Sequence, residues 1–259
     1  MKRVERTYGK VIKGLMFAVN PIKKMAVKTT CIVHKFINLQ AIHILSNDGY
    51  EEASNYYKQY VKYLNDGVTW ADQDFKSTNH FFHYSKEKGL YGFSNALEEC
   101  LKYNRKAIEN IEKGNIRKGM FYLGAACHLI QDSTVPQHVN NALLKSHRNF
   151  ELWIISKLFS DYDFAIEKGL IEYDSVEKYI KANAKVAYET HEKHFELEDK
   201  ESRYYNISTT ILKQAQRSTA GYLLLFYKNN IKELKNNEII SWAEEFLLQR
   251  NSFVFIEFT

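Results

Sequence analysis

Proline is nearly absent from this chain of 259 residues, which contains only Pro21 and Pro136. Because proline interrupts helices, long stretches run without a strong helix breaker. Apolar residues recur at helical spacing along most of the sequence, as in CIVHKFINLQAIHIL at residues 31–45, and no alternating strand pattern recurs. The sequence therefore predicts an all-α fold, a single-domain multi-helix bundle.

The same spacing predicts the other helices. The segment 51–64 is expected to end at Asn65-Asp66-Gly67, and residues 68–89 are expected to form a long polar and aromatic loop of the kind that is often functional. Residues 196–203 are expected to be a charged loop, and the ending SFVFIEFT a short strand or an apolar tail. The remaining helices are expected at about residues 92–113, 115–133, 146–159, 174–195, 204–229 and 237–249.

Composition supports one globular unit. Hydrophobic residues make up 45% of the chain and charged residues 26%, values that exclude a disordered chain. No linker long enough to separate domains is visible, so we expect a single domain over residues 1–259, with an N-terminal extension at 1–29, a core at 30–229 and a C-terminal extension at 230–259.

The net charge and the number of cysteines limit the classes of function that the chain can have. A net charge of +5 suits an anionic partner such as phospholipid or nucleic acid, although it is too small to establish one. No stretch is long and apolar enough for a transmembrane helix. Three scattered cysteines, Cys31, Cys100 and Cys127, imply no disulfide framework. The basic N-terminal segment is expected to be amphipathic, with a signal peptide as the lesser alternative.

Histidine and acidic residues appear at helical spacing near the centre of the chain. His128 and Asp132 are four residues apart and share one face of a helix, about one turn before Pro136, and His138 follows that proline. A second pair of the same form, His147 and Glu151, begins an apolar helix. Either pair alone is most often an ordinary side-chain contact.

Further candidate ligands lie upstream. His34 interrupts the apolar stripe of residues 31–45, and the loop contains Asp72, Asp74, His80 and His83. Imidazoles and carboxylates without thiolates are the chemistry of catalytic zinc sites. Two helical pairs together with this loop therefore predict a metal site.

These residues carry a resemblance to a known family, the zinc-dependent bacterial phospholipases C, which include the catalytic domain of clostridial alpha-toxin. The segment GMFYLGAACHLIQDSTVPQHVNN resembles the family's FYLG–x–x–x–H–x–x–x–D motif with its following proline and histidine. SHRNFE resembles its H–x–x–x–E helix, VHKFINLQAIHIL its first helix and AQRSTAGYLLLFY its last catalytic-domain helix. The resemblance covers about residues 30–229.

The resemblance implies an all-α domain that binds two or three Zn²⁺ ions. By motif, His34 falls on the first histidine ligand, and His128 and Asp132 fall on ligands of the central sites, with Asp132 bridging two ions. Asp72 falls on the aspartate that is both ligand and proposed general base, with Asp74 in reserve, and His80 falls on a ligand histidine. The three protein ligands of another zinc fall on His138, His147 and Glu151.

Two departures from the family pattern concern the third zinc and the headgroup. In the family, the amino group and carbonyl of an N-terminal tryptophan complete the third zinc site, whereas the matching region here, NPIKKMAVKTT, has no tryptophan. We therefore expect two tightly bound ions and a third that is weakly bound or lost. Gln73 and Ser77 stand where the choline-binding enzyme has aromatic residues, so a choline cage is not supported.

The resemblance implies hydrolysis of a phospholipid to diacylglycerol and a phosphorylated headgroup, with phospholipid substrate or a membrane surface as the partner. One alternative is a single-strand nuclease or phosphomonoesterase that uses a similar zinc cluster; nucleic acid is the less expected substrate. A second alternative is a non-catalytic metal-binding relative. The location is expected to be cytoplasmic because no convincing signal peptide is present, with secretion, as in the resembled family, as the alternative.

Overall fold

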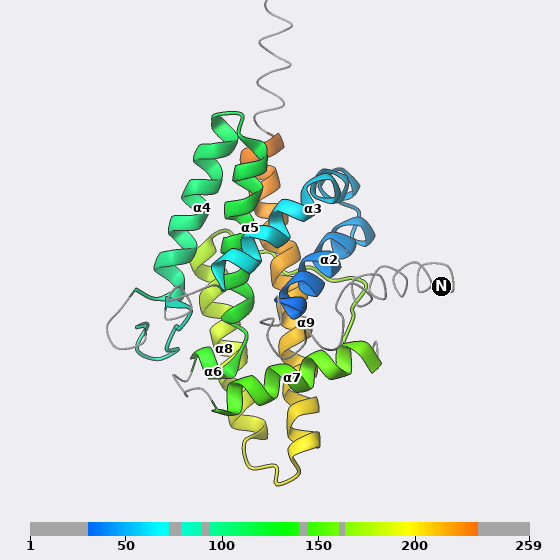
Figure 1. The fold of residues 1–259 in the computed structure, drawn as a ribbon, viewed down its shortest axis with the longest axis vertical. Coiled ribbons are helices and arrows are strands. Elements are labelled where there is room, and N and C mark those ends of the chain that lie inside the picture. Colours follow the sequence, from blue (N-terminus) through cyan, green and yellow to red (C-terminus); the bar gives the residue numbers. More distant parts are fainter. Residues whose placement is uncertain (1–30, 73–78, 90–93, 140–144, 161–163, 233–259) are drawn as a thin grey trace, which may run out of the picture. The chain divides into compact units, whose positions relative to one another are not determined.

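The computed structural model describes residues 31–72, 79–89, 94–139, 145–160 and 164–232, and it confirms the all-α prediction, since no strand occurs among these residues (Figure 1). In chain order the helices are α2 (Ile32–Asn47), α3 (Glu51–Ala71), α4 (Ala96–Glu112), α5 (Ile116–Asp132), α6 (Pro136–Val139), α7 (Lys145–Ser160), α8 (Val176–His194), α9 (Lys200–Phe226) and the short π-helical segment η4 (Tyr227–Lys232).

The chain divides into two units, Met1–Ile32 and Val33–Thr259, and the helices belong to the second unit apart from the first residue of α2. The boundaries predicted at residues 29–30 and 229–230 stay predictions. The predicted helix at 237–249 and the ending SFVFIEFT lie outside the described residues. None of the described helices is both long and apolar enough to cross a bilayer.

Helix α5 is the centre of the bundle. Every residue from Leu123 to Asp132 is buried, and α3 and α4 pack along its length while α8 and α9 contact it from another side (Figure 1). The side chains of α5, α3, α4 and α8 share one large apolar cluster, and a smaller cluster joins α7 to α9. Helix α2 links the two, since Ile37 belongs to the smaller cluster and Ile44 to the larger one.

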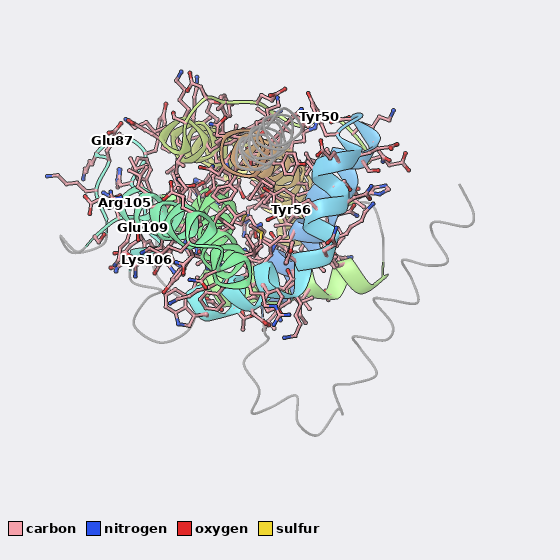
Figure 2. The ribbon with its side chains drawn as sticks, turned by 90° about the horizontal axis from the view of Figure 1, so that it is seen from above. Tyr50, Tyr56, Glu87, Arg105, Lys106 and Glu109 are labelled. Atoms are coloured by element: carbon pink, nitrogen blue, oxygen red, sulfur yellow. The ribbon has the colours of Figure 1, made fainter. Side chains whose placement is uncertain are left out.

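Outer faces of the helices are polar, as the amphipathic pattern predicts. On α4, Arg105 and Glu109 point away from the bundle, whereas Tyr103 and Ala107 are buried (Figure 2). The helix is capped by Asn95, whose side chain accepts a hydrogen bond from the backbone N–H of Glu98 at 3.0 Å.

The prediction that α3 ends at Asn65-Asp66-Gly67 is wrong, because the helix continues to Ala71. A Cβ atom at Gly67 would overlap the carbonyl group of Phe121, and one at Gly124 would overlap the carbonyl group of Leu64. The two glycines therefore let the backbones of α3 and α5 approach each other closely, and Gly67 does not terminate the helix. This extension places Asp72 at the C-terminal cap of α3.

The predicted boundaries of α9 and of the segment after Pro136 also need correction. Helix α9 begins at Lys200 rather than at 204, because the Asp199 side chain caps it by accepting from the Ser202 N–H at 2.8 Å. Helix α5 ends at Asp132, before Pro136, and Pro136 starts the unpredicted helix α6, since proline suits the first position of a helix.

We predict that Gly124→Ala lowers the free energy of unfolding by about 1–3 kcal/mol, because the new methyl group would push the backbones of α3 and α5 apart. The matched control is Gly119→Ala on the same helix, where the new atom would meet mainly the movable side chain of Ile111, 2.6 Å from its Cδ1. We expect a smaller loss there. Denaturant unfolding of both variants checks this, and a Gly124→Ala protein as stable as the wild type would contradict the close contact.

Candidate metal centre

Asp132 ends α5, and its side chain is only 5% exposed. One turn earlier on the same face, His128 places Nε2 at 3.0 Å from Asp132 Oδ2. The four-residue spacing predicts this shared face, and the structure adds that the face is directed into the protein rather than to solvent.

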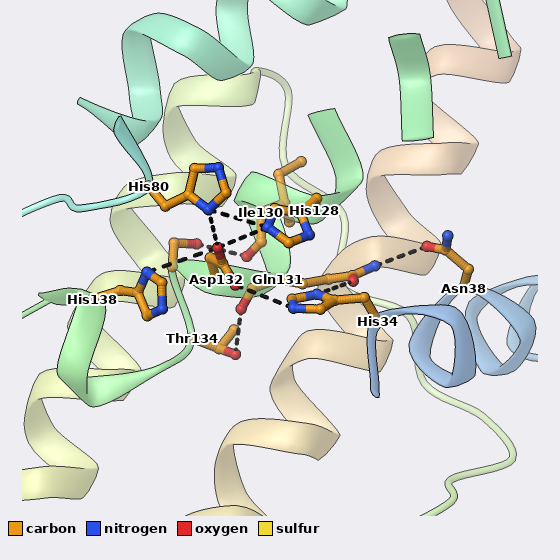
Figure 3. A network of polar contacts seen from close by, with 10 residues as sticks. His34, Asn38, His80, His128, Ile130, Gln131, Asp132, Thr134 and His138 are labelled. Atoms are coloured by element: carbon orange, nitrogen blue, oxygen red, sulfur yellow. Dashed lines mark hydrogen bonds and ion pairs between the residues drawn. The ribbon is translucent and has the colours of Figure 1, made fainter. Parts of the chain in front are cut away.

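Three more imidazoles converge on the same carboxylate from other parts of the chain (Figure 3). His80, in the segment between α3 and α4, places Nδ1 at 2.9 Å from Asp132 Oδ2. His34 of α2 places Nε2 at 3.3 Å from Oδ1, and His138 of α6 places Nδ1 at 3.8 Å from Oδ2. The structure therefore brings together residues that lie far apart in sequence.

The segment that contains His80 is held against α6 by backbone hydrogen bonds. The N–H of Phe82 donates to the carbonyl of His138 at 3.1 Å, and the N–H of Ala96 donates to the carbonyl of Phe81 at 3.1 Å. The ring of Phe81 stacks on the His138 imidazole with centroids 5.1 Å apart. An irregular segment can thus position a ligand because backbone hydrogen bonds at Phe81 and Phe82 fix the chain next to His80.

Electrostatics favour an ionised Asp132 and a neutral His34. Burial alone would raise the pKa of Asp132, but the charges of His128 and His138 and hydrogen bonds from His128 and His80 hold that pKa well below its ordinary value. Burial lowers the pKa of His34, and His128 lowers it further, although Asp132 and Asp72 act in the opposite direction. An ionised carboxylate and neutral imidazoles are the forms that bind metals.

These residues fit zinc. A buried carboxylate surrounded by imidazole nitrogens needs protons or a metal between the atoms. Ligands about 2.0–2.1 Å from a tetrahedral zinc are separated from one another by about 3.3 Å. The His34, His80 and His128 nitrogens lie 2.9–3.3 Å from Asp132 oxygens, close to that value. In addition, the buried Nδ1 of His128 has no hydrogen-bond partner in the described part of the chain.

Within each of two groups of residues, the possible ligand atoms lie within 4.8 Å of one another. The first group is His34, His128 and Asp132, and the second is Asp72, His80 and His128. His128 belongs to both groups, and Asp132 contacts members of both. Asp72 is exposed, unlike Asp132, and lies at the end of α3 where solvent reaches it.

The predicted ligand set of His138, His147 and Glu151 is only partly visible. Glu151 is exposed on α7 and joins neither group among the described residues. His147 lies on the same helix, but its side chain is outside what the structure describes, as is the reserve candidate Asp74. His83 is half-buried, and its Nδ1 lies 3.3 Å from the Ser85 hydroxyl.

The structure adds functional candidates that the sequence analysis missed, Gln131 and Asn38. Both are buried, and Gln131 contacts His34 directly. Gln131 immediately precedes Asp132 in sequence, yet an amide next to a ligand carries no recognisable spacing signal. Only the packing of α2 against α5 shows that these side chains belong to the site.

A comparison with protein-family models identifies a family for this chain. The family model described as zinc dependent phospholipase C matches residues 33–222, which is most of the chain. The chain belongs to this family. The match includes every ligand candidate named above, from His34 in α2 to Glu151 in α7.

Two curated relatives are similar over most of this chain. A phospholipase C of Clostridium novyi is 25% identical over 243 residues, covering 79% of this chain and 61% of the relative. A phospholipase C of Paraclostridium bifermentans is 22% identical over 249 residues, covering 82% of this chain and 62% of the relative. The chain therefore spans about three fifths of the length of these relatives.

Solved structures show the same fold. The alpha-toxin of Clostridium perfringens from an avian strain matches with a TM-score of 0.66 at 20% identity, covering 76% of this chain and 64% of the toxin chain. The alpha toxin of Clostridium absonum matches with a TM-score of 0.68 at 19% identity, covering 77% of this chain and 64% of the toxin chain.

We predict that Asp132→Ala and His128→Ala each remove most of the bound zinc, because both residues contact several of the other ligand candidates. Unfolding free energy should fall as well, since metal binding contributes folding free energy. Elemental analysis and thermal unfolding measure the two effects. The control is His191→Ala near the end of α8, which should keep wild-type zinc content. Undiminished zinc in the Asp132 variant would contradict the assignment.

Proposed function

We propose that this protein is a zinc-dependent phosphodiesterase of phospholipase C type, which hydrolyses a phospholipid to diacylglycerol and a phosphorylated headgroup. The observation that supports it is the convergence of four imidazoles on buried Asp132 in a chain of this family. The names of the curated relatives point to the same activity.

Zinc, when bound, would act as a Lewis acid towards phosphoryl oxygens and make water a better nucleophile near neutral pH. The two groups that share His128 would hold it, with Asp132 contacting both. We infer two tightly bound ions and a third, at His34, bound less tightly, because the region that matches the family's N-terminal tryptophan has no tryptophan here. His34 also shares one of its two partners, His128, with the neighbouring group. His138, His147 and Glu151 are the proposed ligands of one of the tight sites.

Asp72 is the proposed general base. It is an exposed carboxylate whose oxygen lies within 4.8 Å of ligand atoms of His80 and His128. From there it can orient a water molecule towards phosphorus and accept its proton. Attack by that water forms a new P–O bond, the bond from phosphorus to the glycerol oxygen breaks, and the glycerol oxygen takes up a proton as diacylglycerol leaves.

We predict that Asp72→Asn lowers kcat by about 100- to 10,000-fold and affects thermal stability much less, because the amide keeps the shape but loses basicity and most of its strength as a ligand. Asp66→Asn is the matched control, since Asp66 is an exposed carboxylate on the same helix that pairs with Lys62. Steady-state kinetics on a soluble phospholipid measures the effect. Loss of activity in Asp74→Asn with a silent Asp72→Asn would assign the base to Asp74 instead.

The substrate class is tested by assaying the purified protein against mixed phospholipid micelles, single-stranded DNA and a phosphate monoester, each with and without a zinc chelator. We expect hydrolysis of phospholipid that chelator abolishes and added zinc restores. Faster cleavage of DNA or of the monoester would favour the nuclease or phosphatase alternative. Zinc binding without any hydrolysis would identify a non-catalytic relative. Elemental analysis of the same preparation counts the ions.

The comparisons give no support to the predicted cytoplasmic location. Structural similarity to two toxins favours the alternative that the protein is secreted. A phospholipid substrate and a membrane surface as partner are consistent with that alternative. Fractionation of the producing cells followed by immunodetection distinguishes the two locations.

A further inference from the structure

The side-chain amides of Gln131 and Asn38 lie on the Nδ1 side of His34, away from Asp132 (Figure 3). The amide of Asn65 extends this row to three. Gln131 Oε1 lies 2.8 Å from His34 Nδ1, and Gln131 Nε2 donates to Asn38 Oδ1 at 2.8 Å. Asn38 Nδ2 in turn donates to Asn65 Oδ1 at 3.0 Å. Gln131 and Asn38 are 1% and 0% exposed, so these hydrogen bonds replace contacts with water that the amides have lost.

The direction of the hydrogen bonds among these amides determines which nitrogen of His34 carries the proton. An amide oxygen can only accept a hydrogen bond, so Gln131 Oε1 requires a proton on His34 Nδ1. The neutral ring then has its lone pair on Nε2, the atom that faces Asp132 Oδ1 at 3.3 Å. Two lone pairs that face each other repel, whereas a cation attracts both. This tautomer therefore suits a metal ligand and does not suit a hydrogen bond from a neutral ring to the carboxylate.

We infer that Gln131, supported by Asn38 and Asn65, is a positioning residue that holds His34 in the tautomer whose Nε2 can bind zinc. The inference rests on the proposed zinc function. If the amide groups were reversed, the Gln131 NH₂ group would face Nδ1, the proton would move to Nε2 and the metal-binding atom would be blocked. Asn38 opposes a reversal of Gln131 alone, because its oxygen accepts from Gln131 while its own NH₂ group donates to Asn65.

Support from this chain of amides matters most at His34, because the ligands available there are shared. Asp132 also contacts His80 and His128, and His128 belongs to both metal groups. A histidine that shares its partner ligands binds an ion more tightly if it is already held in one tautomer and one orientation, because less conformational entropy is then lost on binding.

The test compares Gln131→Met with Gln216→Met. Gln216 is buried, like Gln131, but its amide bonds only to the backbone, with Nε2 donating to the carbonyls of Phe164 and Leu212 at 2.6 and 2.9 Å. Both variants lose the hydrogen bonds of a buried amide, so both report general destabilisation. Only Gln131→Met removes the group that contacts a ligand histidine.

We expect Gln131→Met to lower the affinity for the zinc ion at His34 by about 10- to 100-fold, measured by chelator competition. This range is typical when a residue that hydrogen-bonds a metal ligand is lost. Imidazole ¹⁵N shifts of the zinc-free protein should show His34 moving from the Nδ1–H to the Nε2–H tautomer. Asn38→Leu should produce a smaller change in the same direction, because Gln131 would keep its contact with His34. Gln216→Met should change neither readout, even if its melting temperature falls.

Unchanged zinc affinity and an unchanged His34 tautomer in Gln131→Met would overturn this inference while leaving the zinc function intact. Equal weakening in Gln131→Met and Gln216→Met would also overturn it, because the effect would then be general destabilisation. A wild-type protein that binds no zinc would overturn the proposed function and this inference together.

Discussion

The rest of the site depends on the burial of one carboxylate, that of Asp132. A buried charge is tolerated only when partners compensate for the lost hydration, and here four imidazoles do so. They come from α2, α5, α6 and the segment before α4, so the need for compensation ties together parts of the chain that are distant in sequence. The same arrangement that makes the carboxylate tolerable in the core suits it to the proposed role of metal ligand.

Close packing of helices sets the geometry around that carboxylate. Gly67 and Gly124 let α3 and α5 approach each other at backbone distance, and the resulting extension of α3 brings Asp72 to the His80 and His128 end of the site. Helix α2 contacts both apolar clusters, which fixes the orientation of His34. Ligands carried on elements that are locked by packing need little reorganisation when they bind an ion.

Two aspartates illustrate how environment separates roles. Asp132 is buried, surrounded by imidazoles and held ionised, which suits a permanent ligand. Asp72 is exposed at a helix end near two of the same imidazoles, which suits exchange of a proton with water. Residues with identical side chains thus serve the proposed reaction differently because solvent reaches one and not the other. The amides behind His34 add a third kind of contribution, in which neutral groups select a tautomer without touching substrate.

The local sequence determined those features of the fold and site that depend on apolar periodicity and on residue spacing within one helix. The scarcity of proline and the 3.6-residue apolar pattern predicted the bundle, and the four-residue spacing of His128 and Asp132 predicted their shared face. The candidates His34, Asp72, His80 and His138 were also recognisable, as isolated residues and through the family's motifs. Only the tertiary structure decided that they meet at one carboxylate, that Gly67 packs against α5 and does not end α3, and that Gln131 and Asn38 support His34. Those outcomes depend on contacts between residues such as His34 and Gln131, which are 97 positions apart, and no local pattern encodes such a contact.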